Sequence, residues 1–342
     1  MCSKQLECFL VKEVQVKERL TRMPDLPYRA YSEHLKARFG QKVYKLPVNL
    51  AGSCPNRDGN LGWGGCIYCG EEGSGFECLP NWIGVKEQLE RNKAYIGRNY
   101  GSRKFIAYFQ AFTNTYLPLE TFAQNIEAAV GDPDIIGLSI STRPDCISDD
   151  YLDRLAEITR GRELAVDIEL GLQTVNYRTL AKINRGHTLA EFIDAVLRVK
   201  QRDFAVCAHL ILNLPGDEEI DVVENAKVLS ALGVQYVKLH ALYILKGTVL
   251  GEMYERGEVQ IISLDEYVER VIAFLEYLHP DVVIQRLIGR APAKNTLFCN
   301  WGVSWWKIRD MIIERMKSRQ SFQGCRCDYL NGKALRKFRG QL

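Results

Sequence analysis

Six short apolar runs alternate with longer amphipathic segments along the 342-residue chain. Runs typical of strands occupy residues 43–50, 104–110, 135–141, 164–170, 204–214 and 235–242. Apolar residues recur at helical spacing in the segments 119–130, 148–160, 189–200, 217–232 and 264–278. Asp217 is expected to cap the fourth of these helices, and Gly233 to end it. The alternation predicts parallel strands joined by helices.

The spacing of the strands indicates the type of α/β fold. From residue 104 onward, successive strands begin about 30–40 residues apart, as in (β/α) barrels. Six strand units rather than eight predict a partial (β/α)6 barrel of the TIM type, open on one side. We expect an N-terminal extension at residues 1–37, the barrel at 38–285 and a small basic C-terminal unit at 286–342.

Polar residues interrupt four of the strands with a period of two. The four sets are Ser139, Ser141 and Arg143; Asp167, Glu169, Gly171 and Gln173; Cys207, His209 and Asn213; Lys238 and His240. Residues two apart in a strand share a face, so we expect these side chains inside the barrel, near its C-terminal mouth, where active sites of this architecture lie. The alternative, that they face outward into helix interfaces, would cost as much desolvation.

A glycine-rich loop after the first strand contains Cys54, Cys66 and Cys69, in the stretch GSCPNRDGNLGWGGCIYCGEEG. A C-x-x-C pair by itself is shared by zinc sites and redox pairs. A zinc site would need a fourth ligand, and Cys78 lies at a spacing that fits no usual second knuckle. Three thiolates suit a 4Fe–4S cluster in which one iron remains free for a ligand from outside the protein.

The cysteine loop and several later motifs resemble the radical S-adenosylmethionine (SAM) superfamily. The loop keeps CIYC at 66–69 but places eleven residues between its first two cysteines, where the superfamily usually has three. This longer gap resembles the subgroup that includes the catalytic subunit of Elongator, and the chain looks most like a family of short bacterial proteins within it. The other matching motifs are STRPD at 141–145, ELGLQT at 169–174, INRGH at 183–187, HLILNLPGD at 209–217 and VKLHALYILKGT at 237–248.

The resemblance implies two cofactors, a 4Fe–4S cluster and SAM, whose reductive cleavage yields a 5′-deoxyadenosyl radical. The residues that it implies as cluster ligands are Cys54, Cys66 and Cys69. The residues that it implies as SAM contacts are Gln110, Ser141, Gln173, Arg185 and His209. Within the second set, Gln173 and Arg185 would hold the SAM carboxylate, Gln110 the amino group, and Ser141 and His209 the ribose.

The same resemblance implies that the substrate is tRNA. We expect the chain to act on the side chain of the wobble uridine and to convert its carboxymethylaminomethyl form to the aminomethyl form. Its partners would be tRNA and an electron donor such as flavodoxin or ferredoxin. Two alternatives remain open at this point: a radical SAM enzyme acting on a small molecule or a protein, and a non-enzymatic module that binds zinc or an iron–sulfur cluster.

Positive charge is concentrated near the C-terminus. The net charge of the chain is +3, yet residues 307–339 carry ten Lys or Arg against three Asp or Glu. Such a segment suggests a polyanionic partner, and a solvated terminus is the alternative. The nearby Trp301, Trp305 and Trp306 could stack on unpaired bases, or could form the core of the C-terminal unit.

No apolar run approaches the roughly 20 residues that span a membrane, and charges throughout the first 20 residues argue against a signal peptide. We therefore expect a cytoplasmic protein without a membrane partner. The cysteines outside the loop are then expected to be reduced and unliganded. For Cys299, Cys325 and Cys327 a second metal site is the open alternative, although their spacing fits no usual pattern.

Overall fold

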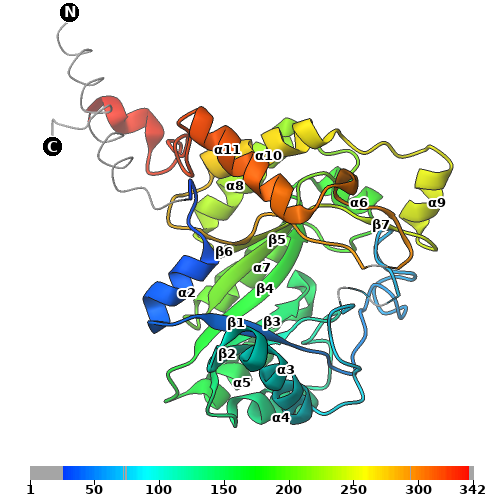
Figure 1. Cartoon of the computed structure of the whole chain (residues 1–342), viewed down its shortest axis with the longest axis vertical. Coiled ribbons are helices and arrows are strands. Elements are labelled where there is room, and N and C mark those ends of the chain that lie inside the picture. The colour runs from blue at the N-terminus through cyan, green and yellow to red at the C-terminus, as the bar shows by residue number, and fades with distance from the viewer. Residues whose placement is uncertain (1–25, 72, 74, 293, 339–342) are drawn as a thin grey trace, which may run out of the picture.

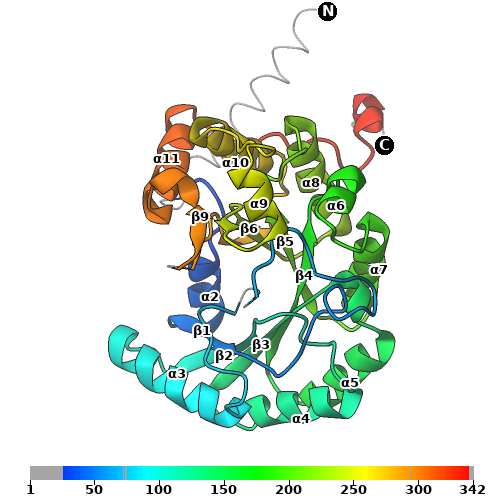
Figure 2. The same ribbon diagram turned by 90° about the vertical axis from the view of Figure 1, so that its right-hand side faces the viewer.

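A computed structural model describes residues 26–338 except 72, 74 and 293. Its main sheet has seven parallel strands in the order β1-β2-β3-β4-β5-β6-β8. These are β1 Val43–Val48, β2 Lys104–Phe109, β3 Ile135–Thr142, β4 Ala165–Gln173, β5 Ala205–Ile211, β6 Tyr236–His240 and β8 Val283–Arg286. Figure 2 shows the strands curled into an open barrel with helices around the outside. The predicted α/β fold, a partial TIM-type barrel, is confirmed.

All six predicted strands are present, and β8 is an addition to them. It pairs with β6 in the same direction. Its four residues, VIQR, hold only two apolar positions, so its pattern is too short to be distinguished from a loop. A second, two-stranded antiparallel sheet joins β7 (Ile244–Leu245) to β9 (Thr296–Phe298).

Each of the five predicted amphipathic segments forms a helix, whereas the helix at 85–100, between β1 and β2, was not predicted. The α-helices of the described residues are α2 Tyr31–Phe39, α3 Val85–Tyr100, α4 Leu119–Val130, α5 Asp149–Thr159, α6 Tyr177–Lys182, α7 Leu189–Lys200, α8 Glu219–Leu232, α9 Val249–Glu255, α10 Leu264–Tyr277 and α11 Trp305–Ser318. Gly233 ends α8 with a left-handed φ of 63°, as expected. The expected cap was wrong by one residue, because Glu218 occupies the N-cap of α8 and Asp217 is buried beside it.

Strand β3 shows how the side chains of a strand alternate between the hydrophobic core and the inside of the barrel. Leu138 and Ile140 are fully buried in the hydrophobic core between the sheet and the helices. Ser139 and Ser141 alternate with them and donate hydrogen bonds to the carboxylates of Asp167 and Glu169 on β4. The predicted interior position of the polar residues is therefore confirmed, and the outward-facing alternative is wrong.

Helix α2 closes the gap between the two end strands of the sheet. Ala30, just before the helix, forms a β-bridge with Ile284 of β8. The ring of Tyr31 lies 5.5 Å from that of Tyr236, the first residue of β6, so it covers the N-terminal end of the barrel. Inside the barrel, Lys45 of β1 donates a hydrogen bond of 3.0 Å to Gln285 of β8. Side chains thus link the first and last strands.

The C-terminal helix α11 packs on the same core through Ile308, Ile312 and Met316. After it, the last described element is a 3-10 helix, Lys333–Phe338, which Figure 1 shows in red, on the side of the barrel away from the blue loops that follow β1. The division of the chain at residues 37 and 285 stays a prediction, and residues 1–25 lie outside the described part. Over that part, no helix combines the length and apolarity that crossing a membrane requires.

Candidate active site

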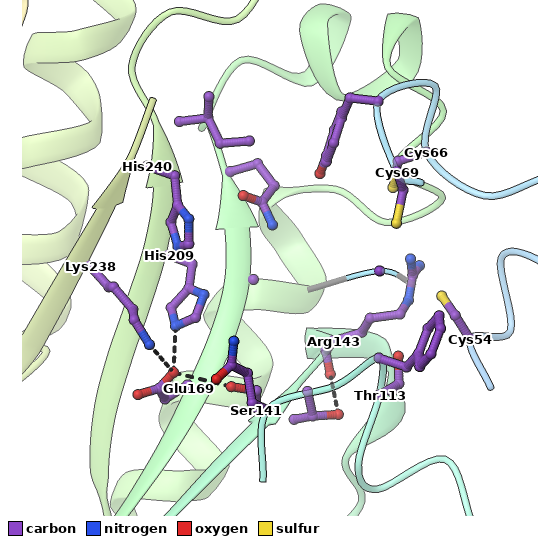
Figure 3. Close-up of a pocket in the computed structure, with 18 of the residues that line it drawn as sticks. Cys54, Cys66, Cys69, Thr113, Ser141, Arg143, Glu169, His209, Lys238 and His240 are labelled. Atoms are coloured by element: carbon purple, nitrogen blue, oxygen red, sulfur yellow. Dashed lines mark hydrogen bonds and ion pairs between the residues drawn. The ribbon is translucent and has the colours of Figure 1, made fainter. Parts of the chain in front are cut away.

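A cavity of about 430 Å³ lies inside the barrel, near the C-terminal ends of its strands. All the residues predicted to contact the cluster or SAM line it: Cys54, Cys66, Cys69, Gln110, Ser141, Gln173, Arg185 and His209. Figure 3 shows the three cysteines on one side of the cavity, and Glu169, His209 and Lys238 on the other. The structure therefore brings together residues from six separate parts of the chain, while the contact that each would make stays a prediction.

The cysteine loop, which we define as residues 50–84 between β1 and α3, is fixed to the segment that follows α6. The Asn56 side chain donates a hydrogen bond of 2.6 Å to the Asn184 carbonyl, and the Asn184 side chain donates one of 2.8 Å to the Gly65 carbonyl. The Ile67 amide donates to the Ile183 carbonyl at 3.1 Å. Residues of the INRGH motif thus hold the cysteine loop over the mouth of the barrel.

The three cysteines of the loop form a set of sulfur donors facing one cavity. Cys66 is buried, Cys54 and Cys69 are half-buried, and all three thiols are free. Cys78 does not line the cavity, so within the described residues the loop offers no fourth thiol there. Three sulfur donors around an accessible space fit a 4Fe–4S cluster with one open iron better than a closed four-ligand zinc site.

Arg57 supports the last cysteine of the set. Its guanidinium donates a hydrogen bond of 2.8 Å to the Cys69 carbonyl and another to the Gly70 carbonyl. Burial raises the pKa of the Cys69 thiol, and the positive charge of Arg57 partly opposes that rise. A cation beside the loop favours the thiolate, which is the form that binds metal.

Arg185 and Arg143 place further positive charge at the cysteine side of the cavity. Arg185 Nη1 lies 3.5 Å from Cys66 Sγ, and Nη2 donates a hydrogen bond of 2.7 Å to the Gly171 carbonyl. Arg143 is paired with Asp145 at 2.7 Å. Among the described residues, Arg185 Nε and Arg143 Nη1 are buried without hydrogen-bond partners. Such donors are costly unless something accepts from them, so they fit a site that receives a carboxylate or another acceptor from a ligand.

Glu169 is the centre of a polar cluster on the opposite side of the cavity. Its carboxylate lies 2.6 Å from Lys45 Nζ, 3.0 Å from Lys238 Nζ and 2.7 Å from His209 Nε2. Burial by itself would raise the pKa of Glu169, but Lys238, Lys45 and His209 outweigh it and hold that pKa well below its usual range. Burial lowers the pKa of His209 to about 4, so its imidazole is neutral near pH 7.

Two of the predicted SAM contacts belong to this cluster. Ser141 donates a hydrogen bond of 3.1 Å to Glu169, which His209 also contacts. If either residue contacts the ribose of SAM, its side chain would bind Glu169 and the ribose at the same time. Gln173 ends β4 with a φ of 76°, a left-handed conformation that turns the chain at the cavity wall.

Several residues of the cavity were not predicted from the sequence, among them Lys45, Tyr108 and Arg286. Lys45 interrupts the first apolar strand, and Tyr108 accepts a hydrogen bond of 2.7 Å from Lys238. Arg286 ends β8, the strand that was not predicted. A lysine inside an apolar run was the available signal for Lys45, whereas a tyrosine in a strand is ordinary.

Glu169, Cys207 and His209 could in principle form a second metal site, because their donor atoms lie within 4.8 Å of one another. A cation placed there would meet the ammonium groups of Lys45 and Lys238, which already neutralise Glu169. We therefore assign this group to the polar cluster and not to a metal.

Most of the described cations in the basic C-terminal segment form ion pairs. The pairs that it forms are Arg309–Asp310, Arg315–Asp265, Arg315–Glu269, Arg319–Glu269, Arg326–Glu276, Lys333–Asp328 and Arg336–Asp328. Helix α10 supplies Asp265, Glu269 and Glu276. The charge count over residues 307–339 did not include these three carboxylates. Six of the nine cations that the structure describes in this segment are thus paired, and its binding to a polyanionic partner stays a prediction.

The three tryptophans near this segment have different environments. Trp301 packs against Tyr267, and its Nε1 donates a hydrogen bond of 2.7 Å to the Ile262 carbonyl. Trp305 and Trp306, in contrast, are 40% and 47% exposed. Trp301 therefore belongs to the core, and the other two do not.

Comparison with known proteins identifies the family. Residues 50–229 match the model of the radical SAM superfamily, and residues 234–318 match that of the radical SAM C-terminal domain. The Bacillus subtilis protein YtqA is 37% identical over 297 residues, which cover 87% of this chain and 92% of YtqA. The Escherichia coli protein YhcC is 34% identical over 272 residues, covering 80% and 86% of the two chains.

The solved structures agree on the fold. The archaeal Elp3 of Methanocaldococcus infernus, lacking its N-terminus, superposes with a TM-score of 0.61 at 18% identity. The match covers 82% of this chain and 64% of the archaeal one. The resemblance seen in the sequence motifs is confirmed, and the chain belongs to the radical SAM superfamily, whose enzymes use a 4Fe–4S cluster together with SAM.

Proposed function

We propose that this enzyme acts on the wobble uridine of tRNA and converts its carboxymethylaminomethyl side chain to the aminomethyl form. The observation that supports the proposal is sequence similarity to two proteins, described next. The tRNA uridine(34) acetyltransferase of Methanocaldococcus jannaschii is 29% identical over 162 residues, 45% of this chain and 28% of that protein. Human Elongator complex protein 3 is 26% identical over 185 residues, 32% of its length. Because less than a third of each relative matches, we carry over the nucleoside and not the acetyl transfer.

The residues at the cysteine side of the cavity have defined parts in this proposal. Cys54, Cys66 and Cys69 would hold the cluster and leave one iron for SAM. Bound together, the two cofactors supply a radical that removes a hydrogen atom from the substrate. Arg185, whose Nε has no partner within the described residues, and Gln173 would hold the SAM carboxylate. The chain's own work is to place the substrate and to exclude water.

The proposed reaction balances with the known cofactors. If the side chain loses its two carboxymethyl carbons as glyoxylate, it takes up one water and is oxidised by two electrons. The conversion of SAM to methionine and 5′-deoxyadenosine is a two-electron reduction, so no further oxidant is needed. In the cell, flavodoxin or ferredoxin would supply the electron that first reduces the cluster, and the second electron released by the substrate would replace it in later cycles.

An exposed tryptophan on the cysteine loop supports an RNA substrate. Trp63 is 78% exposed. In the sequence it lies between Cys54 and Cys66, which both line the cavity. Its indole rests on Gly59, where a Cβ would come within 2.4 Å of the ring, so the loop holds the aromatic surface in place. Aromatic side chains stack on unpaired bases, as in an anticodon loop, and a nucleotide must leave its stack to enter an interior cavity.

The position of the C-terminal segment also favours the cysteine loop as the surface that contacts tRNA. Its cations are mostly paired, and its 3-10 helix, Lys333–Phe338, lies on the side of the barrel away from the cysteine loop, as Figure 1 shows. We therefore place the tRNA contact at the cysteine loop and not at the C-terminal segment.

Anaerobic turnover with modified tRNA tests the proposal. Protein carrying its cluster is incubated with SAM, dithionite and tRNA isolated from cells that lack this enzyme, and the nucleosides are analysed by mass spectrometry. We expect carboxymethylaminomethyl uridine to decrease and aminomethyl uridine to increase, with 5′-deoxyadenosine formed in step. Cys66→Ala is the inactive control. Cleavage of SAM with unchanged nucleosides would overturn the proposal and favour a small-molecule or protein substrate.

A further inference from the structure

The inner side of the cavity, across from the cysteines, contains one more cation than carboxylate. Lys45 Nζ lies 2.6 Å from Glu169 and 3.6 Å from Asp167, and Lys238 Nζ lies 3.0 Å from Glu169. These two lysines and two carboxylates balance one another. Arg286 lines the same space and adds a further positive charge.

Arg286 has no carboxylate partner within the described part of the chain. It is the register partner of Lys238 on the neighbouring strand, so both side chains point into the barrel. Its Nη2 donates a hydrogen bond of 2.7 Å to His240 Nδ1, and its Nε is buried without a partner there. Burial and the Arg286 charge hold the pKa of His240 well below its usual value, so His240 is neutral and cannot balance that charge.

The excess charge also affects the neighbouring lysine. Burial, assisted by Lys45 and Arg286, lowers the pKa of Lys238 to about 8, although Glu169 opposes that shift. Buried charges in proteins are normally paired, because an uncompensated charge in a closed space is costly. The geometry is thus that of a site that can bind an anion.

We infer that Arg286, with Lys238 and His240 beside it, forms a subsite that binds a carboxylate of the substrate. A guanidinium can donate two parallel hydrogen bonds to one carboxylate, and Arg286 has donors left over after its bond to His240. The nearby Gly289 leaves the guanidinium room to turn, since a Cβ there would lie 3.4 Å from Arg286 Nη2.

The identity of the carboxylate rests on the proposed function. The carboxymethylaminomethyl side chain ends in a carboxylate, whereas the aminomethyl product has none. Binding at Arg286 would draw that end of the side chain inward and leave the adjacent carbon between the subsite and the cysteine loop. The same contact would discriminate against the product, because the product would leave Arg286 unpaired.

Binding of a small probe tests the subsite independently of any reaction on tRNA. The probe is N-methylglycine, and the comparison compound is N-methylglycinamide, in which an uncharged amide replaces the carboxylate; their binding to the SAM-loaded holoenzyme is measured by saturation-transfer NMR. We expect the acid to bind and the amide not to bind. Arg286→Gln should weaken binding of the acid by about 10- to 100-fold, the usual range for a charge-assisted contact.

Control variants separate this role from a structural one. Arg290 lines the same cavity but is paired with Glu77 at 2.6 Å, so Arg290→Gln should bind the acid as the unaltered protein does. Arg286→Lys should recover part of the affinity, because it keeps the charge and loses the two-pronged geometry. Equal binding of acid and amide by the unaltered protein, or unchanged binding of the acid by Arg286→Gln, would overturn the inference. Weaker SAM binding in Arg286→Gln would also overturn it, by assigning Arg286 to the cofactor.

Turnover then distinguishes the inference from the proposed function. The substrates are the modified tRNA and the same tRNA with the side-chain carboxylate converted to an amide. The unaltered enzyme should prefer the carboxylate in kcat/KM, and Arg286→Gln should lose that preference. If the probe binds at Arg286 but neither tRNA reacts, the proposed function fails while the subsite stands. If the carboxylate tRNA reacts and Arg286→Gln keeps the full preference, the subsite fails while the function stands.

Discussion

The guanidinium of Arg185 lies 3.5 Å from the sulfur of Cys66, although 119 residues separate the two in the chain. Arg185 is 7% exposed and also donates to the Gly171 carbonyl, so its charge is held at the cysteine side of the cavity. A buried cation beside a ligand sulfur stabilises the reduced state of a bound cluster, because that state is the more negative one. We therefore expect Arg185 to influence the cluster in addition to its proposed contact with SAM.

We therefore predict that Arg185→Gln makes the reduction potential of the cluster more negative. One unit charge removed within a few ångströms, at an effective dielectric constant near 20, corresponds to a shift on the order of 100 mV. Redox titration followed by electron paramagnetic resonance measures the potential. Arg290→Gln, which removes a cation paired with Glu77, is the control and should leave the potential unchanged. An unaltered potential in Arg185→Gln would show that its charge does not reach the cluster.

The cysteine loop should account for all the bound iron. Anaerobically prepared protein is expected to contain about four iron and four sulfide per chain. Cys54→Ala, Cys66→Ala and Cys69→Ala should each lose most of this iron, as measured by metal analysis and by absorbance near 400 nm. Cys78→Ala is the matched control, since Cys78 does not line the cavity and burial raises its pKa to about 12. Stoichiometric zinc without iron would contradict the assignment.

Trp63→Ala should weaken tRNA binding while leaving the cluster intact. Loss of one base-stacking contact amounts to about 1–3 kcal/mol, or about 5- to 150-fold in Kd, which filter binding at fixed salt would measure. Trp305→Ala is the comparison, because Trp305 is 40% exposed on α11, in the C-terminal region. A larger effect from Trp305→Ala than from Trp63→Ala would move the RNA contact back to the C-terminal segment.

Glu169→Gln should destabilise the barrel. The change leaves Lys238 buried without its carboxylate and Lys45 with Asp167 alone, at 3.6 Å. Breaking a buried ion pair on one side costs about 3–5 kcal/mol. Urea unfolding, followed by circular dichroism, gives the free energy of unfolding. Glu127→Gln breaks a surface pair with Arg154 and should cost less than about 1 kcal/mol. Similar values for the two variants would mean that the buried cluster contributes no more than the surface pair.

Asp217 should make the stability depend on pH. Burial raises the pKa of Asp217 from 3.8 to about 6. Between these values the folded state keeps a proton that the unfolded state releases, so stability falls as the pH rises from about 4 to 6 and the loss is complete above that range. Asp217→Asn removes the loss and should be more stable by about 2–3 kcal/mol at pH 7.5.

Urea titrations across this pH range check the Asp217 prediction. The advantage of Asp217→Asn should shrink as the pH falls toward about 4.5, because the native carboxyl is then already protonated. Asp203 is exposed, so Asp203→Asn should change stability little at any pH. A constant advantage of Asp217→Asn at every pH would indicate a packing effect instead of a titration.

The elements predicted best are those whose pattern lies within a few neighbouring residues. The helices at 119–130 and 189–200 match α4 and α7 residue for residue, because each has an apolar stripe of about three turns. The period of two in β3 and β4 likewise identified the interior side chains before their neighbours were known. Strand β8 was missed because four residues are too few to show a period.

The amino-acid sequence was sufficient to recognise the cysteine set, the motifs that identify the superfamily and the alternation that builds the barrel. Those features depend on residue types at short spacing, which the chain carries whether or not it is folded. The partners of the charges, in contrast, are known only from the folded structure. Lys45 meets Glu169 across 124 residues, Arg315 meets Glu269 across 46, and Arg286 meets no carboxylate within the described residues. Coulomb interactions act through space, so the charge of a site depends on which strands and helices the fold places side by side.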